Sequence, residues 1–83
     1  MNQAIQFPDR EAWEGEYHAV CFPVLVNGFQ LTCAIAGDTL RARYGSDEPE
    51  IDIFRAHRWD LEEEAEVLIK QQQEDAQGWV WLR

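Results

Sequence analysis

The sequence predicts an α+β fold in which a small antiparallel sheet packs against two or three helices. Two apolar runs joined by Asn27-Gly28 make up residues 20–35, and a helical hydrophobic pattern follows in residues 60–73. A last apolar run, residues 79–82, has strand character and returns the chain to the sheet. We expect all 83 residues to form a single domain, because this length supports one modest core.

The hairpin prediction depends on Asn27-Gly28, because both central residues of a type I′ turn adopt positive φ. A two-residue loop sets the register of the strands, and directly opposed residues share a face of the sheet. Four apolar pairs then line one face: Val26 with Phe29, Val24 with Leu31, Phe22 with Cys33, and Val20 with Ile35. The other face is mixed and carries Pro23, which cannot donate to a ladder, so we expect the first strand at or near an edge.

The chain before the hairpin predicts one further strand. Residues 3–7 alternate polar and apolar side chains, and Pro8 ends the run. The polar residues 9–16 are expected to form a turn region. The chain should then enter the hairpin directly, which gives a meander of three strands.

The segment after the hairpin carries two helix signals. Asp38 or Thr39 can cap a short helix that Gly45 ends, although a strand is an alternative for so short a segment. Residues 46–49, Ser-Asp-Glu-Pro, are typical of the start of a second helix.

The longest predicted helix covers residues 60–73. Asp60 followed by Glu63 resembles a capping box, and the apolar stripe behind it should cover the apolar face of the sheet. The sequence leaves open whether residues 47–73 form one bent helix or two.

The composition excludes several classes of function. The formal net charge is −9, so binding to nucleic acid or to an anionic membrane surface is disfavoured. No apolar run approaches the length that spans a bilayer, and the first ten residues lack the basic and apolar regions of a signal peptide. We therefore expect a cytoplasmic protein.

The two cysteines, Cys21 and Cys33, lie on opposite faces of the predicted hairpin, so they cannot meet the geometry of a disulfide. Free thiols fit a reducing compartment. No cysteine or histidine has a partner at metal-ligand spacing, and no motif orients a nucleophile and a base. The sequence predicts no metal, no cofactor and no catalytic residues.

The densest acidic cluster is Glu62, Glu63, Glu64 and Glu66. The helix dipole explains glutamates at a helix start, and Glu66 can pair with Lys70 four residues later. The alternatives are a face that binds a basic partner and a divalent-cation site, which a straight helix disfavours because its side chains fan outward. Glu62, Glu63 and Glu66 are therefore candidate partner-binding residues.

Basic side chains are concentrated between two acidic flanks, since residues 38–59 contain four of the seven. If the two short helices meet, these groups would form one site for a carboxylate or a phosphate, which arginine holds in bidentate fashion. The alternative is that each arginine pairs with a nearby acid such as Asp38, Asp52 or Asp60. The candidate anion-binding residues are Arg41, Arg43, Arg55, His57 and Arg58.

Trp79 and Trp81 share one face of the last predicted strand. That strand is apolar on both sides, which indicates either a position inside the sheet or one face used as an interface. The tryptophan face is then either core or an anchor for a partner or a second copy of the chain, because tryptophan is enriched at interaction hot spots.

Four stretches resemble a known family: MNQAIQFPDR, CFPVLVNGFQLTCAI, FRAHRWDLEEEAEVLI and QGWVWL. They are similar to a bacterial family of domains of unknown function with a Shew3726-like α+β fold, and the resemblance covers nearly the whole chain. It implies a bacterial cytosolic protein whose antiparallel sheet packs against helices. It implies no activity and no catalytic residues, because the family has none assigned.

Two functions follow from these candidate residues. The first is a small non-enzymatic protein-interaction module that uses the acidic helix face or the tryptophan strand. The second is a binder of a small anionic ligand at Arg41, Arg43, Arg55 and Arg58. An enzyme is the least favoured function, because no catalytic motif is present.

Overall fold

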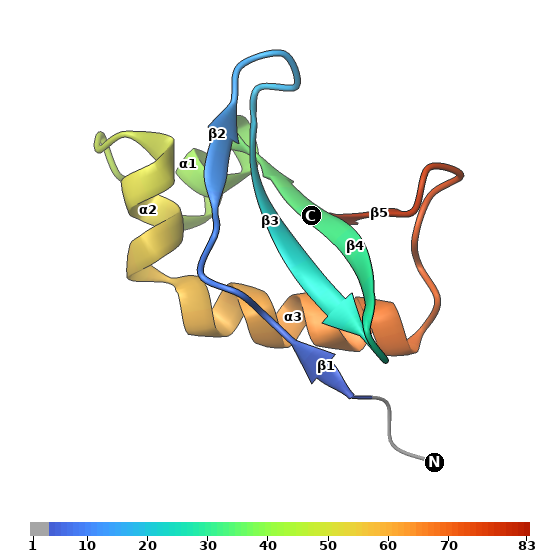
Figure 1. Cartoon of the computed structure of the whole chain (residues 1–83). Coiled ribbons are helices and arrows are strands. Elements are labelled where there is room, and N and C mark those ends of the chain that lie inside the picture. Colours follow the sequence, from blue (N-terminus) through green and yellow to red (C-terminus); the bar gives the residue numbers. More distant parts are fainter. Residues whose placement is uncertain (1–3) are drawn as a thin grey trace.

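The computed structural model describes residues 4–83 and contains a five-stranded mixed sheet with three helices (Figure 1). The strands are β1 (Ile5–Gln6), β2 (Ala12–Glu14), β3 (Ala19–Val26), β4 (Phe29–Ala36) and β5 (Trp79–Leu82). The helices are α1 (Gly37–Tyr44), α2 (Glu50–Ala56) and α3 (Arg58–Lys70). The predicted α+β class is confirmed.

The hairpin of β3 and β4 has the predicted register, from Val26 opposite Phe29 to Val20 opposite Ile35. Asn27 and Gly28 have φ values of 52° and 86°, as a type I′ turn requires. The apolar face of the hairpin lies against the helices. Phe29, next to the turn, is the exception and is 75% exposed.

The sheet order is β1-β3-β4-β5, and β2 also pairs with β3. The expected antiparallel return of the last strand is wrong, because β5 pairs with β4 in parallel. Three helices lie between β4 and β5, and a helical crossover brings the following strand back in the same direction. β5 is an edge strand, so its two apolar sides do not indicate a position inside the sheet.

Pro23 lies where β3 lacks a neighbour on its outer side. β1 pairs with Leu25 and Val26, and β2 pairs with residues 19–21, which leaves residues 22–24 between them. Pro23 is opposite Thr32, and in this register the missing N–H faces the gap rather than β4. The proline therefore costs the sheet no hydrogen bond.

The region before the hairpin differs from the expectation. The predicted strand over residues 3–7 is observed as β1, while Gln3 lies outside the described residues. The predicted turn region contains β2, whose three residues are exposed and so show no hydrophobic alternation. The Trp13 ring of β2 contacts the start of α1, since a Cβ on Gly37 would lie 3.0 Å from it.

Helix α1 ends as predicted, at Gly45 with φ of 58°. It begins at Gly37, whose N–H donates to the carbonyl of His18 at 2.9 Å. Neither Asp38 nor Thr39 caps the helix, because both lie inside it and the N-cap position is Ala36.

The second helical region forms two helices rather than one bent helix. α2 begins directly after Pro49, and His57, with φ of −120°, separates α2 from α3. α3 begins at Arg58, so the predicted capping box at Asp60 is wrong. α3 ends at Lys70, three residues earlier than predicted.

The core lies between the helices and one face of the sheet. The largest fully buried side chains come from β3, β4, β5 and all three helices: Phe22, Phe54, Ile35, Leu40, Ile53, Leu61, Val20, Val24, Val80 and Cys33. Cys21 lies on the other face with Ala19 and Ala34, so the two free thiols are separated as predicted. Within residues 4–83, no helix has the length and apolar character to cross a membrane.

Candidate functional site

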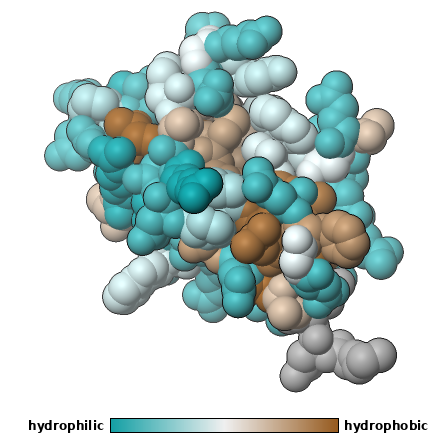
Figure 2. Space-filling model, in the orientation of Figure 1, coloured by the Kyte–Doolittle hydropathy of each residue, from teal (hydrophilic) through white to brown (hydrophobic). Residues whose placement is uncertain are grey.

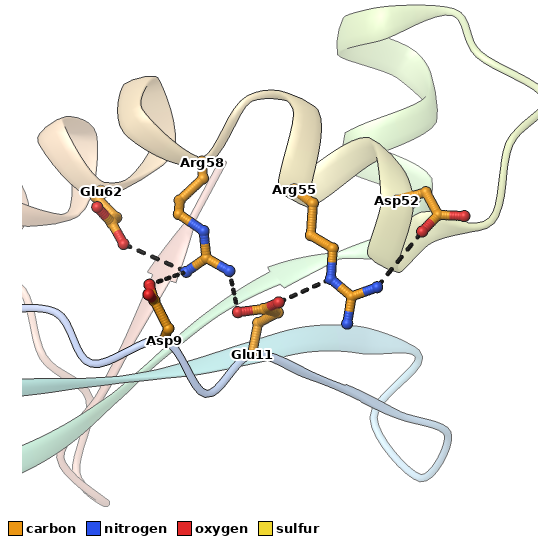
Figure 3. A network of polar contacts seen from close by, with 6 residues as sticks. All are labelled: Asp9, Glu11, Asp52, Arg55, Arg58 and Glu62. Atoms are coloured by element: carbon orange, nitrogen blue, oxygen red, sulfur yellow. Dashed lines mark hydrogen bonds and ion pairs between the residues drawn. The ribbon is translucent and has the colours of Figure 1, made fainter.

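Six charged side chains join the segment between β1 and β2 to the junction of α2 and α3 (Figure 3). Glu11 is central, since one carboxylate oxygen accepts from Arg55 Nε at 2.7 Å and the other accepts from Arg58 Nη2. Arg58 Nη1 also lies 3.4 Å from Asp9 and 3.5 Å from Glu62. We call this group the Glu11 network: Asp9, Glu11, Asp52, Arg55, Arg58 and Glu62.

The Glu11 carboxylate is held in its charged form. Its side chain is only 10% exposed, and burial by itself raises the pKa of a carboxyl group. The hydrogen bonds from Arg55 and Arg58 outweigh burial and lower the pKa of Glu11 to about 2. At Glu62 the effect of burial is the larger one, so the pKa of this carboxyl group is raised despite the attraction of Arg58.

The Glu11 network is negative overall, because its two guanidinium groups face four carboxylates. Arg58 Nη1 is buried and has no hydrogen bond within residues 4–83, although two carboxylates lie within ion-pair distance. An anion would therefore have to replace a carboxylate before it could bind these arginines.

The other two candidate arginines belong to separate contacts. Arg41 lies 3.3 Å from Glu50 and donates to the carbonyl of Ser46, while Arg43 forms a bidentate pair with Glu64 at 2.7 Å. The Glu64 hydrogen bonds raise the pKa of Arg43. All four candidate arginines thus have carboxylate partners, as the alternative expected, but Asp52 is the only nearby acid among those foreseen from the sequence.

His57 does not join the arginines. Its ring stacks on Tyr44 with centroids 3.6 Å apart and an interplanar angle of 6°. Anion binding by Arg41, Arg43, Arg55, His57 and Arg58 stays a prediction. The structure divides these five residues among four sets of contacts.

The candidate acidic residues on α3 differ in their exposure and in whether they form an ion pair. Glu62 is turned toward Arg58 and is 18% exposed, and Glu66 pairs with Lys70 at 3.5 Å, as predicted. Glu63 is exposed and forms no ion pair within residues 4–83. Glu63 is therefore the member of this set whose charge is most available to a partner.

Trp59 is a candidate residue that the sequence analysis missed. Its side chain is 84% exposed at the start of α3. A signal was present in the helical spacing, because Trp59 lies one turn before Glu63 on the solvent side. Starting the predicted helix at Asp60 left this position outside the pattern.

Trp79 and Trp81 lie on the sheet face that points away from the helices. Both are half-buried against Ala19, Cys21 and Ala34, and their rings stack with centroids 5.8 Å apart. Tyr17 contacts Trp79 with ring centroids 5.0 Å apart. The visible surface in Figure 2 is mostly hydrophilic, with hydrophobic side chains in small separate areas.

The thiol on that face is not activated. Burial, together with the nearby charge of Glu14, raises the pKa of Cys21 to about 11, so the thiol is protonated at neutral pH. His18, three residues earlier, is exposed in a turn with φ of 50°. No group of three or more His, Cys, Asp or Glu in the described part of the chain is arranged to hold a metal ion.

The fold and these contacts define a small acidic α+β protein with a mixed sheet, one helical layer and four arginines paired with carboxylates. The chain belongs to the DUF1488 family, described as a protein of unknown function, which matches residues 5–82.

Relatives and a solved structure agree with this assignment. The chain is 66% identical over 84 residues to the uncharacterized protein YrdB of Escherichia coli (strain K12) and 64% identical to YrdB of Shigella flexneri. Both matches cover 99% of each chain. The fold is similar to the crystal structure of a protein of unknown function of the DUF1488 family from Shewanella loihica PV-4. The TM-score is 0.91 and the identity is 29%, with 99% of this chain and 94% of that chain covered.

Proposed function

We propose that this protein is a small interaction module that binds a basic segment of another protein through the outward face of α3. The observation that carries the proposal is the exposure of Trp59, at 84%, on a helix with acidic surroundings. A tryptophan is the side chain most enriched at interaction hot spots, because it buries a large area at a small entropic cost.

The outward face of α3 consists of residues at helical spacing. Trp59, Glu63 and Val67 follow at intervals of four, and Val67 is 50% exposed. Glu66 and Lys70 complete the face. Two apolar groups two turns apart, with a carboxylate between them, fit a partner that presents apolar side chains next to a lysine or an arginine.

The charge of the protein favours a basic partner. The formal net charge is −9, and neither Asp60 nor Glu63 has an ion-pair partner within residues 4–83. Complementary charge raises the rate of encounter with a basic partner and disfavours acidic partners at the α3 face. The apolar contacts at Trp59 would then set the lifetime of the complex.

Affinity capture from a bacterial lysate with matched variants tests this proposal. Trp59→Ala and Glu63→Lys should each lose a basic protein that the unchanged chain retains. Phe29→Ala and Asp47→Lys are the controls, because they alter an exposed aromatic residue and an exposed acid elsewhere. Thermal melting should show all four variants folded, since surface changes shift stability by about 0.5 kcal/mol or less.

The pattern of loss decides the outcome. Retention by the two controls together with loss in both α3 variants supports docking on α3. Equal retention by Trp59→Ala and the unchanged chain would contradict it.

A further inference from the structure

The second face of the sheet is covered by no helix within the described residues. Its buried cluster contains strand residues only, Ala19, Cys21 and Ala34, and the side chains packed on them are Trp79 and Trp81. The pairing registers place these side chains in one layer, with Ala12 beside Cys21 and Ala34 beside Trp81. We call this layer the uncovered sheet face.

A shallow groove of about 370 Å³ crosses the uncovered sheet face. Residues from β2, β3, β4 and β5 line it, with Cys21 and Pro23 at β3 and the Tyr17–Trp79 pair beside them. The groove is open to solvent and the thiol is protonated, so the groove suits side chains of a docked protein better than an enzymatic substrate.

The groove carries charged side chains that form no ion pair within residues 4–83, whereas most basic side chains of the molecule are paired. Arg41, Arg43, Arg55, Arg58 and Lys70, five of the seven basic side chains, have carboxylate partners. Arg10 and Glu14 both line the groove, both are exposed, and neither has an ion-pair partner within residues 4–83. The groove therefore presents one open cation and one open anion.

We propose that a second copy of this chain docks on the uncovered sheet face around a twofold axis. Such an axis makes the contact self-complementary, so Arg10 of each copy meets Glu14 of the other and two ion pairs form. The stacked tryptophans then lie within the dimer contact, where aromatic side chains contribute most. This docking uses different residues from the α3 face and does not depend on it.

The edge of β5 offers a weaker contact than this face. Both backbone groups of Trp79 on that edge are already bonded, because its N–H donates to Asp75 Oδ1 at 2.9 Å and its carbonyl accepts from Asp75 N–H at 2.7 Å. A partner strand would find few free groups there. Face-to-face packing is the arrangement that the charges and the aromatic residues favour.

Analytical ultracentrifugation from micromolar to millimolar concentration tests the proposal. The unchanged chain should shift reversibly from monomer to dimer as concentration rises. Arg10→Glu and Glu14→Arg, each a change of an exposed side chain, should weaken the dimer about tenfold or more, as expected for charge pairs across an interface. The double variant should recover most of the lost affinity, because the swap restores both pairs.

The controls separate this surface from α3. Trp59→Ala should dimerise like the unchanged chain, while Trp81→Ala should weaken the dimer. A chain that stays monomeric over the whole range overturns the proposal. So does a double variant that dimerises no better than the single ones, since the paired charges would then not meet.

Discussion

Glu11 lies in the segment between β1 and β2, yet its carboxylate contacts two arginines of the helical layer. Its partners are 44 and 47 residues away along the chain, so no local pattern announces them. A carboxylate that accepts two charge-assisted hydrogen bonds at 10% exposure is costly to neutralise, because two guanidinium groups would lose their partner. The contact connects the sheet edge to the α2–α3 junction.

Replacing Glu11 with glutamine should lower the free energy of unfolding at pH 7 by about 1–3 kcal/mol. The pKa of Glu11 is lowered from 4.5 to about 2, so its contribution is fully present above pH 4.5 and is lost as pH falls toward 2. Urea unfolding at pH 7 and at successively lower pH should therefore show the gap between Glu11→Gln and the unchanged chain closing below pH 4.5.

The control for this change is Glu16→Gln. Glu16 is exposed and forms no ion pair within residues 4–83, so its substitution should leave unfolding nearly unchanged at pH 7. A constant gap for Glu11→Gln across the whole pH range would show that the charge of Glu11 is not the source of its effect.

At the scale of elements, the hairpin turn decides how β3 and β4 meet, and β4 then positions β5. The turn residues have positive φ, and a shift of one residue would turn the apolar face of the hairpin away from the helices. Helix α3 also has an inner and an outer side. The inner side packs on the core through Leu61, Ala65 and Ile69. On the outer side, Trp59 and Glu63 face the solvent. Each element thus uses one side for packing and leaves the other for contacts.

Gly28→Ala should destabilise the protein by about 1 kcal/mol. Gly28 has φ of 86°, where a side chain costs about 1–2 kcal/mol, partly offset by the smaller freedom of alanine in the unfolded chain. Gly15→Ala is the matched control, since the φ of Gly15 is not positive and the new Cβ would have its nearest contact at 4.0 Å.

Thermal melting separates the two glycine variants, because 1 kcal/mol corresponds to about 4–8 °C for a chain of this size. The melting temperature should fall for Gly28→Ala and stay nearly unchanged for Gly15→Ala. Equal shifts would mean that positive φ at the turn is not what the hairpin requires.

At the scale of the whole molecule, features set by neighbours in sequence were predictable and features set by distant contacts were not. The hairpin register follows from Asn27-Gly28, and the end of α1 follows from Gly45. The direction of β5 depends on how the helices cross the sheet, and β2 exists only because β3 pairs with it. Neither of these is encoded in a local pattern.

For the candidate functional residues, too, local features were predictable and distant contacts were not. Trp79 and Trp81 were expected to share a strand face, and strand periodicity was sufficient for that. Which face the helices would leave uncovered was not predictable, because it depends on where all three helices pack. The arginines lie close in sequence, but their carboxylate partners come from distant segments and divide them into separate contacts.

The strength of the sheet should vary across the molecule. β3 and β4 pair over eight residues each at the centre of the core, whereas β1 and β2 contribute two and three residues at the margin. Native-state hydrogen exchange should therefore show that amides in residues 5–14 exchange through a local opening that exposes little surface. Amides in residues 33–35 should exchange only through global unfolding.

Low concentrations of urea distinguish the two routes, because urea accelerates exchange in proportion to the surface that opening exposes. Exchange in residues 5–14 should be almost independent of urea, and exchange in residues 33–35 should rise steeply. The same slope in both segments would mean that the marginal strands open only with the whole molecule. In that case the Glu11 network would join them to the core as one cooperative unit, because its ion pairs are the charged contacts between that segment and the helices.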